Sequence, residues 1–182
     1  GSMPDIGAYE HFTALPLVGW RSDFKIQSEN PELDLHQLVF GIAERATENY
    51  DEGLDVTAPP APQSPIRLDA YFVSSETFTS RLLSNYKPSA QSISYQFKVR
   101  ADLDDFTLSW NVSGLPLEFT DIQLKQVAPA SAMVIDMKTA SGASFSALAN
   151  QYYSFELILS PSIIWSSQII VSSTDQQINP SS

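Results

Sequence analysis

The sequence contains no cysteine and only two histidines, His11 and His36. Disulfide bonds, thiolate catalysis and cysteine-ligated zinc are therefore excluded. A catalytic or zinc-binding histidine needs convergent partners, and neither histidine has them along the chain. The sequence also lacks a G-x-S-x-G elbow, an S-x-x-K motif and a glycine-rich phosphate loop. We therefore expect a protein that is not an enzyme and has no catalytic residues.

Charged residues are scarce, at 17% of the chain, and the net charge is −11 with a pI near 4.4. An acidic surface repels phosphate backbones and anionic lipid, so nucleic acid is not an expected partner. No apolar run approaches the ~20 residues of a membrane-spanning helix. The acidity instead suits a cation or a basic protein partner.

Apolar residues alternate with polar ones along several short runs, which indicates β-strands with one buried face. The clearest runs lie at 93–100 and 106–112, which we interpret as an antiparallel hairpin around an acidic break. Similar runs at 20–27 and 35–42 predict a first hairpin, whereas residues 75–86 could include a short helical turn. Eight to ten strands with frequent turn signals predict an all-β fold, an antiparallel β-sandwich of immunoglobulin-like type with an N-terminal β extension.

The proline-rich stretch and the changes in composition divide the chain into five predicted segments. Residues 1–3 look like an expression scar, and residues 4–56 form an N-terminal β segment that is either separate or part of the same sandwich. The proline-rich stretch 57–66 is a linker or an extended crossover. Residues 67–174 form the sandwich, and residues 175–182 form a flexible tail.

The chain from Asp51 onward carries an ordered set of short pieces. They are Tyr50-Asp51-x-Gly53-Leu54-Asp55 before a proline cluster, Ala70-Tyr71-Phe72, Arg81-Leu82-Leu83-Ser84-Asn85-Tyr86, Thr107-Leu108-Ser109-Trp110-Asn111 before Leu115-Pro116, Ile135-Asp136-Met137 and Tyr153-x-Phe155. This order resembles a recurring segment of large exported proteins of environmental Gram-negative bacteria, which look like immunoglobulin- or fibronectin-like sandwiches. The resemblance implies a non-catalytic role in carriage, spacing or attachment, outside the cell or at its surface. It supplies no functional residues to carry over.

Two acidic loops are candidate Ca²⁺ sites, because hard cations prefer several carboxylate and carbonyl oxygens. One comprises Asp51, Glu52 and Asp55, and the other comprises Asp102, Asp104 and Asp105. The alternative for each loop is a solvated acidic turn. Calcium is the only cofactor that the sequence suggests.

Aromatic residues suggest a second kind of site, because exposed rings can stack on sugars. Trp20 and Trp110 are in phase with apolar neighbours and are expected in the core. Tyr152 and Trp165 could contribute to an exposed ligand-binding face. The sequence thus favours a non-catalytic module of an exported protein that acts in spacing, cell-surface attachment or protein–protein interaction within an extracellular assembly. The alternative is a carbohydrate-binding module of an extracellular polysaccharide-degrading system.

Overall fold

The structure is a computed structural model that describes residues 18–29, 35–75 and 80–161. The expectations for residues 1–3 and 175–182 and for His11 and Trp165 lie outside the described residues. Eleven strands and no helix are present in the described part. The strands are β1 (Val18–Ser28), β2 (Leu35–Ala43), β3 (Val56–Thr57), β4 (Asp69–Val73), β5 (Arg81–Lys87), β6 (Ile93–Arg100), β7 (Phe106–Trp110), β8 (Asp121–Ala128), β9 (Val134–Asp136), β10 (Gly142–Phe145) and β11 (Tyr153–Ser160). The all-β prediction is confirmed.

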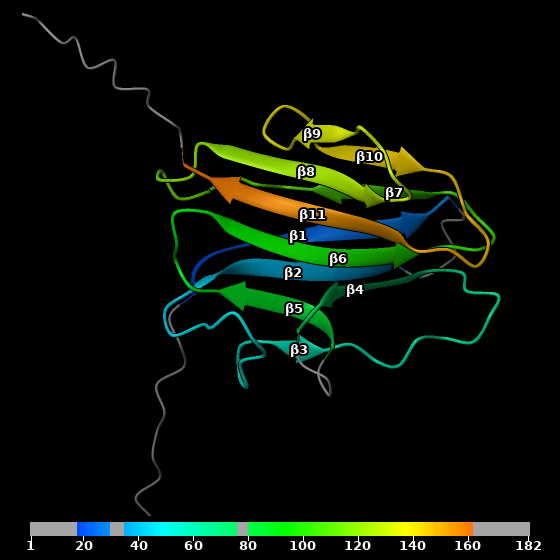
Figure 1. Cartoon of the computed structure of the whole chain (residues 1–182), viewed down its shortest axis with the longest axis horizontal. Helices are drawn as coiled ribbons and strands as arrows, with labels where there is room; N and C mark the ends of the chain where they lie inside the picture. Colours follow the sequence, from blue (N-terminus) through cyan, green and yellow to red (C-terminus); the bar gives the residue numbers. More distant parts are fainter. Residues whose placement is uncertain (1–17, 30–34, 76–79, 162–182) are drawn as a thin grey trace, which may run out of the picture.

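The strands form a single mixed sheet in the order β10-β7-β1-β2-β5-β4-β6-β11-β8-β9, with β3 attached to β5. The sheet curls into a half-barrel, so that β6, β11 and β8 lie over β1, β2 and β7 (Figure 1). The prediction of a purely antiparallel arrangement is wrong at one place, because β2 and β5 pair in parallel. The two strands between them in sequence, β3 and β4, both run antiparallel to β5, so β5 enters the sheet in the same direction as β2.

Strand β5 links the two halves of the curled sheet. Its first two residues pair with β4, while Ser84 to Lys87 pair with Val39 to Ile42 of β2. Strand β3 also pairs with β5, at Leu82 and Ser84. The region 75–86, whose sequence allows a short helical turn, therefore contributes a strand over its described C-terminal part.

The hairpin predicted for residues 93–112 does not form. β6 pairs with β4 and β11, whereas β7 pairs with β1 and β10, so the acidic break carries the chain from one half of the sheet to the other. Alternation alone cannot distinguish two paired strands from two strands in facing layers, because both have one buried face.

The hairpin predicted from the two N-terminal runs is confirmed, since β1 pairs with β2 in antiparallel register. These strands lie in the interior of the sheet order, with β7 on one side and β5 on the other. The proline-rich stretch runs from β3 toward β4. It is attached to the sheet by hydrogen bonds from Ala58 N to Arg81 O and from Arg81 Nε to Pro59 O.

The core consists of the inward faces of both halves. In β6 and β11 every second residue is buried, as the period of two predicts. Aromatic rings join the halves: the centroid of Phe24 lies 4.7 Å from that of Phe97, and Phe97 stacks on Phe155 at 5.0 Å. Trp20 and Trp110 are both buried, which confirms their expected place in the core. Such contacts add to the stabilisation from burial.

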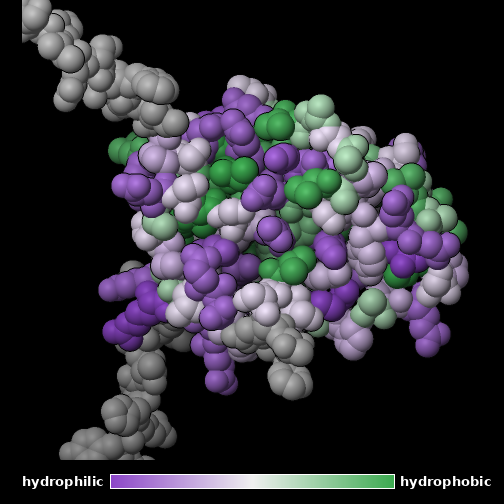
Figure 2. All heavy atoms as spheres, viewed as in Figure 1, coloured by the Kyte–Doolittle hydropathy of each residue, from purple (hydrophilic) through white to green (hydrophobic). Residues whose placement is uncertain are grey.

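The outer surface over β6, β11 and β8 is mainly hydrophilic or intermediate in hydropathy, with separate hydrophobic spots (Figure 2). In the described part of the chain no helix is long and apolar enough to cross a membrane.

Candidate functional site

A polar hollow lies between β5 and β6, beside the C-terminal end of β4. Its volume is about 400 Å³. It exists because β5 leaves β4 after two paired residues and continues along β2, so no strand fills the space next to β6. The described lining residues come from four segments: Glu48 and Asn49, Val73 to Ser75, Asn85 and Lys87, and Ser94 and Gln96.

Asn85 is the most buried polar residue among the described lining residues, with only 7% of its surface exposed. Its side-chain amide has no hydrogen-bond partner within the described residues. Yet no polar side-chain atom in the described part is fully enclosed without a partner. The amide atoms of Asn85 must therefore reach the space of the hollow. An amide that reaches the hollow without a protein partner can pair there with water or with a ligand.

Paired side chains surround Asn85 at the rim. Lys87 Nζ lies 2.6 Å from Glu48 Oε2, and Ser75 Oγ donates a 3.0 Å hydrogen bond to Asn49 Oδ1. The Lys87 ammonium also lies 5.7 Å from the ring centroid of Tyr95. These contacts connect the loop before β3, the segment after β4 and strand β5, and thereby fix the shape of the opening.

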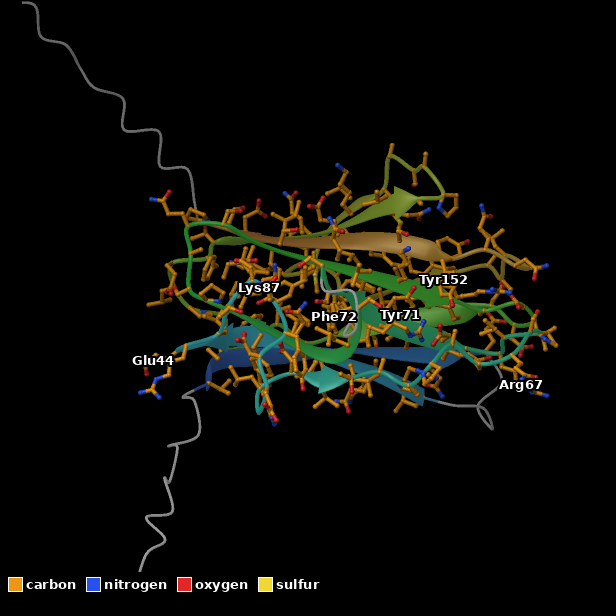
Figure 3. All side chains as sticks on the ribbon, turned by 60° about the horizontal axis from the view of Figure 1, so that its bottom comes forward. Glu44, Arg67, Tyr71, Phe72, Lys87 and Tyr152 are labelled. Carbon is orange, nitrogen blue, oxygen red and sulfur yellow. The ribbon has the colours of Figure 1, made fainter. Side chains whose placement is uncertain are left out.

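A second cluster comprises Tyr71, Tyr152, Arg81 and Asp69. Asp69 is buried and accepts hydrogen bonds from Arg81 Nη2 at 2.7 Å and from Tyr152 Oη at 2.8 Å. The Arg81 guanidinium lies 3.8 Å from the Tyr71 ring centroid, and the two tyrosine rings meet edge to face at 5.9 Å. The two tyrosines lie next to each other in Figure 3, with Lys87 further along the molecule. Burial raises the pKa of both phenols, so the two rings stay neutral.

Tyr152, the predicted ligand-binding residue, thus lies beside Tyr71, which sequence reasoning missed. Its predicted companion Trp165 is outside the described residues. The planes of Tyr71 and Tyr152 are 77° apart, so these two rings do not form a flat stacking platform. The outward position of Tyr71 between buried Ala70 and Phe72 is the signal that could have identified it.

The acidic loop at 102–105 connects β6 to β7, and its carboxylates hold this connection in place by hydrogen bonds to other segments. Asp102 accepts hydrogen bonds from Arg100 Nε and Nη2, from Ile66 N and from Asn150 N, all between 2.7 and 2.9 Å. The hydrogen bonds from Arg100 hold the pKa of Asp102 well below its ordinary value. Asp105 accepts from Ala147 N at 2.8 Å, whereas Asp104 has no partner within the described residues.

The loop at 51–55 is organised by its own carboxylates. Asp51 accepts hydrogen bonds from the backbone N and the hydroxyl of Thr47, at 2.6 and 3.1 Å. Asp55 is buried and accepts from Asp51 N and Tyr86 N. Burial raises its pKa, against the lowering effect of these two hydrogen bonds. Glu52 is exposed.

No group of three acidic or histidine side chains gathers to hold a metal ion within the ranges that the structure describes. Calcium binding at either loop stays a prediction, which a Ca²⁺ titration of the melting temperature can test. His36 is half-buried on β2, and no partner that would make it a base is found in the described part of the chain.

Comparison of the chain with protein-family models, with curated proteins and with solved structures found no match.

Proposed function

We propose that this chain is a non-catalytic β-sandwich-like module of an exported bacterial protein, of the immunoglobulin- or fibronectin-like kind that its motifs resemble. Its role is to space other domains or to attach the protein to an extracellular partner at the cell surface. Its partners are other domains or proteins of the same assembly.

The observation that carries the proposal is the set of hydrogen bonds that the Asp102 carboxylate accepts. This carboxylate accepts four hydrogen bonds from three separate segments: Arg100 at the end of β6, Ile66 before β4, and Asn150 before β11. Carboxylates that accept several charged and backbone donors are held in one geometry. Asp69 and Asp55 bridge segments in the same way. The acidic side chains thus stiffen connections, which suits a module that must keep its shape between neighbours.

The test uses the full-length protein in its own cells. We expect a tag placed in this module to be accessible to antibody and to added protease on intact cells. Replacing the module with an unrelated rigid β-domain of similar length should preserve the display of neighbouring domains, if spacing is the role. Loss of attachment in the replaced protein, with display intact, would assign the attachment role instead. Confinement of the tag to the cytoplasm would contradict the proposal.

A further inference from the structure

We propose that the hollow between β5 and β6 binds a neutral polyhydroxylated ligand, a sugar unit of a glycan chain, with Asn85 as its central contact. The inference rests on the attachment role proposed above and names the class of ligand to which the module would attach.

The first argument is the state of the Asn85 amide. It is 93% buried and has no protein partner within the described residues, but it opens into the hollow. A side-chain amide offers two donors and one acceptor oxygen. Because these groups open into the hollow, they can pair there with water or with a ligand, which a valine or leucine at the same position could not do. A ligand that hydrogen-bonds the amide would explain why a polar residue stands there.

The second argument is the mixture of groups around the amide. The rim carries the hydroxyls of Ser75 and Ser94 and the amides of Asn49 and Gln96. Ser75 Oγ donates to Asn49 Oδ1 and Ser94 Oγ donates to Glu156 Oε1 at 2.9 Å, so the two hydroxyls offer a ligand their acceptor lone pairs. Gln96 is exposed, and its side chain has no partner in the described part of the chain. Vicinal hydroxyl groups of a sugar both donate and accept, and therefore complement such a mixture. Val73 supplies an apolar contact for the C–H groups of a ring.

The third argument concerns charge. The only charged residues among the described lining residues are Lys87 and Glu48, and their side chains are joined at 2.6 Å. The pair is neutral, but the Glu156 carboxylate, which accepts a 2.9 Å hydrogen bond from Ser94 Oγ, adds a negative charge beside the rim, and the chain as a whole carries −11. An anionic glycan would be repelled at long range and would find no uncommitted cation in this hollow. A neutral ligand is therefore favoured.

The size of the hollow is also suitable. At about 400 Å³ it lies within the roughly 300–1,000 Å³ of small-molecule sites. This volume has room for one unit of a longer glycan chain.

The experiment measures ¹⁵N chemical shifts of the complete chain during titration with neutral gluco-, galacto-, manno- and xylo-oligosaccharides. Fragments of polygalacturonate form the anionic arm. We expect at least one neutral oligosaccharide to cause saturable shifts of the Asn85 side-chain amide and of the backbone at residues 94–96. Shifts confined to residues around Tyr152, binding of the anionic fragments alone, or no shift with any neutral sugar would overturn the inference.

The decisive variant is Asn85→Leu, which keeps the approximate volume and removes the amide. We expect a loss of affinity of about tenfold or more, with no fall in melting temperature, because no protein hydrogen bond is broken. A lower melting temperature would show that the amide is bonded within the protein, and would remove the basis of the inference. Unchanged affinity would do the same.

A rim variant keeps the test valid if Asn85→Leu does not fold. Gln96→Ala should weaken binding, while Gln151→Ala, which removes an exposed glutamine before β11, should not. Equal effects of the two variants would contradict the site. The experiments distinguish a failure of this inference from a failure of the proposed function. If the protein is displayed at the surface but binds no sugar, only this inference is overturned. If the protein is cytoplasmic but binds sugar, only the export proposal is overturned.

Discussion

Arg100 and Asp102 are joined by two hydrogen bonds of 2.7 Å, from Nε to Oδ1 and from Nη2 to Oδ2. Only one residue separates them, so the pair closes a tight turn at the point where the chain leaves β6. Ile66 N and Asn150 N complete the shell of donors around the carboxylate. The crossing between the two halves of the sheet therefore depends on one ionised side chain.

Asp102→Asn should destabilise the fold, because an amide cannot accept from Arg100 and from both backbone donors at once. We expect a fall in melting temperature of about 4 °C at neutral pH. The folded-state pKa of Asp102 is depressed, so its contribution is present above the unfolded value of 3.8 and is lost as the pH falls. The difference between wild type and variant should accordingly shrink in acid. Asp104→Asn in the same loop is the control and should melt like the wild type.

Gly41→Ala should be strongly destabilising. A Cβ atom at this position would overlap the backbone oxygen of Trp20 on the neighbouring strand and would lie 2.9 Å from Tyr86 Cε1. Backbone cannot move aside cheaply in the middle of a sheet, so we expect a loss of about 2–3 kcal/mol in the free energy of unfolding, measured in urea. Gly19→Ala is the matched control, because its Cβ would meet only Ile42 O at 3.5 Å. Similar losses in the two variants would contradict the steric explanation.

Tyr95→Phe tests the contact across the core. The Tyr95 hydroxyl is buried and donates a 2.6 Å hydrogen bond to Gly41 O, and its removal should cost about 1–2 kcal/mol. Burial raises the pKa of Tyr95 above its ordinary 10.0, so the phenol contributes stability below that pH, and this contribution is lost as the pH rises. Melting curves across the alkaline range should show a smaller loss of stability in the variant than in the wild type. An identical alkaline loss would mean that Tyr95 is not the group responsible.

Trp110→Phe should loosen the edge of the sheet. The indole Nε1 of Trp110 donates to Met137 O at 3.2 Å and to Ala140 O at 2.8 Å, which fixes the connection from β9 to β10. Faster amide hydrogen exchange at residues 137–143 is expected, with little change in β6 and β11. Trp20→Phe is the comparison, since its indole makes only a 3.4 Å hydrogen bond to Ser113 O. Unchanged exchange at residues 137–143 in Trp110→Phe would contradict this role.

Much of the fold could be predicted from local alternation. The buried faces of β1, β6, β7 and β11 follow the period of two because each strand has one wet side. The pairing of those strands could not be predicted: the parallel contact of β2 with β5 and the separation of β6 from β7 depend on residues far apart in the chain. Sequence reasoning singled out Asp102 as a calcium ligand and Tyr152 as a ligand-binding residue, which stay predictions, and it did not predict the hydrogen-bond partners of either residue. It missed Asn85, because a single asparagine in a strand gives no sign of the hollow it faces.

The parallel pairing of β2 with β5 also sets the order in which the strands can be added to the sheet. β1 lies between β2 and β7, and β2 acquires its second neighbour only from β5. During synthesis the first hairpin must therefore wait, with its remaining edges unmatched, until Lys87 and then Trp110 have left the ribosome. Pairing between strands so far apart in sequence slows folding. Until it is complete, the apolar strands β1 and β2 have unpaired edges that can associate with the wrong partners.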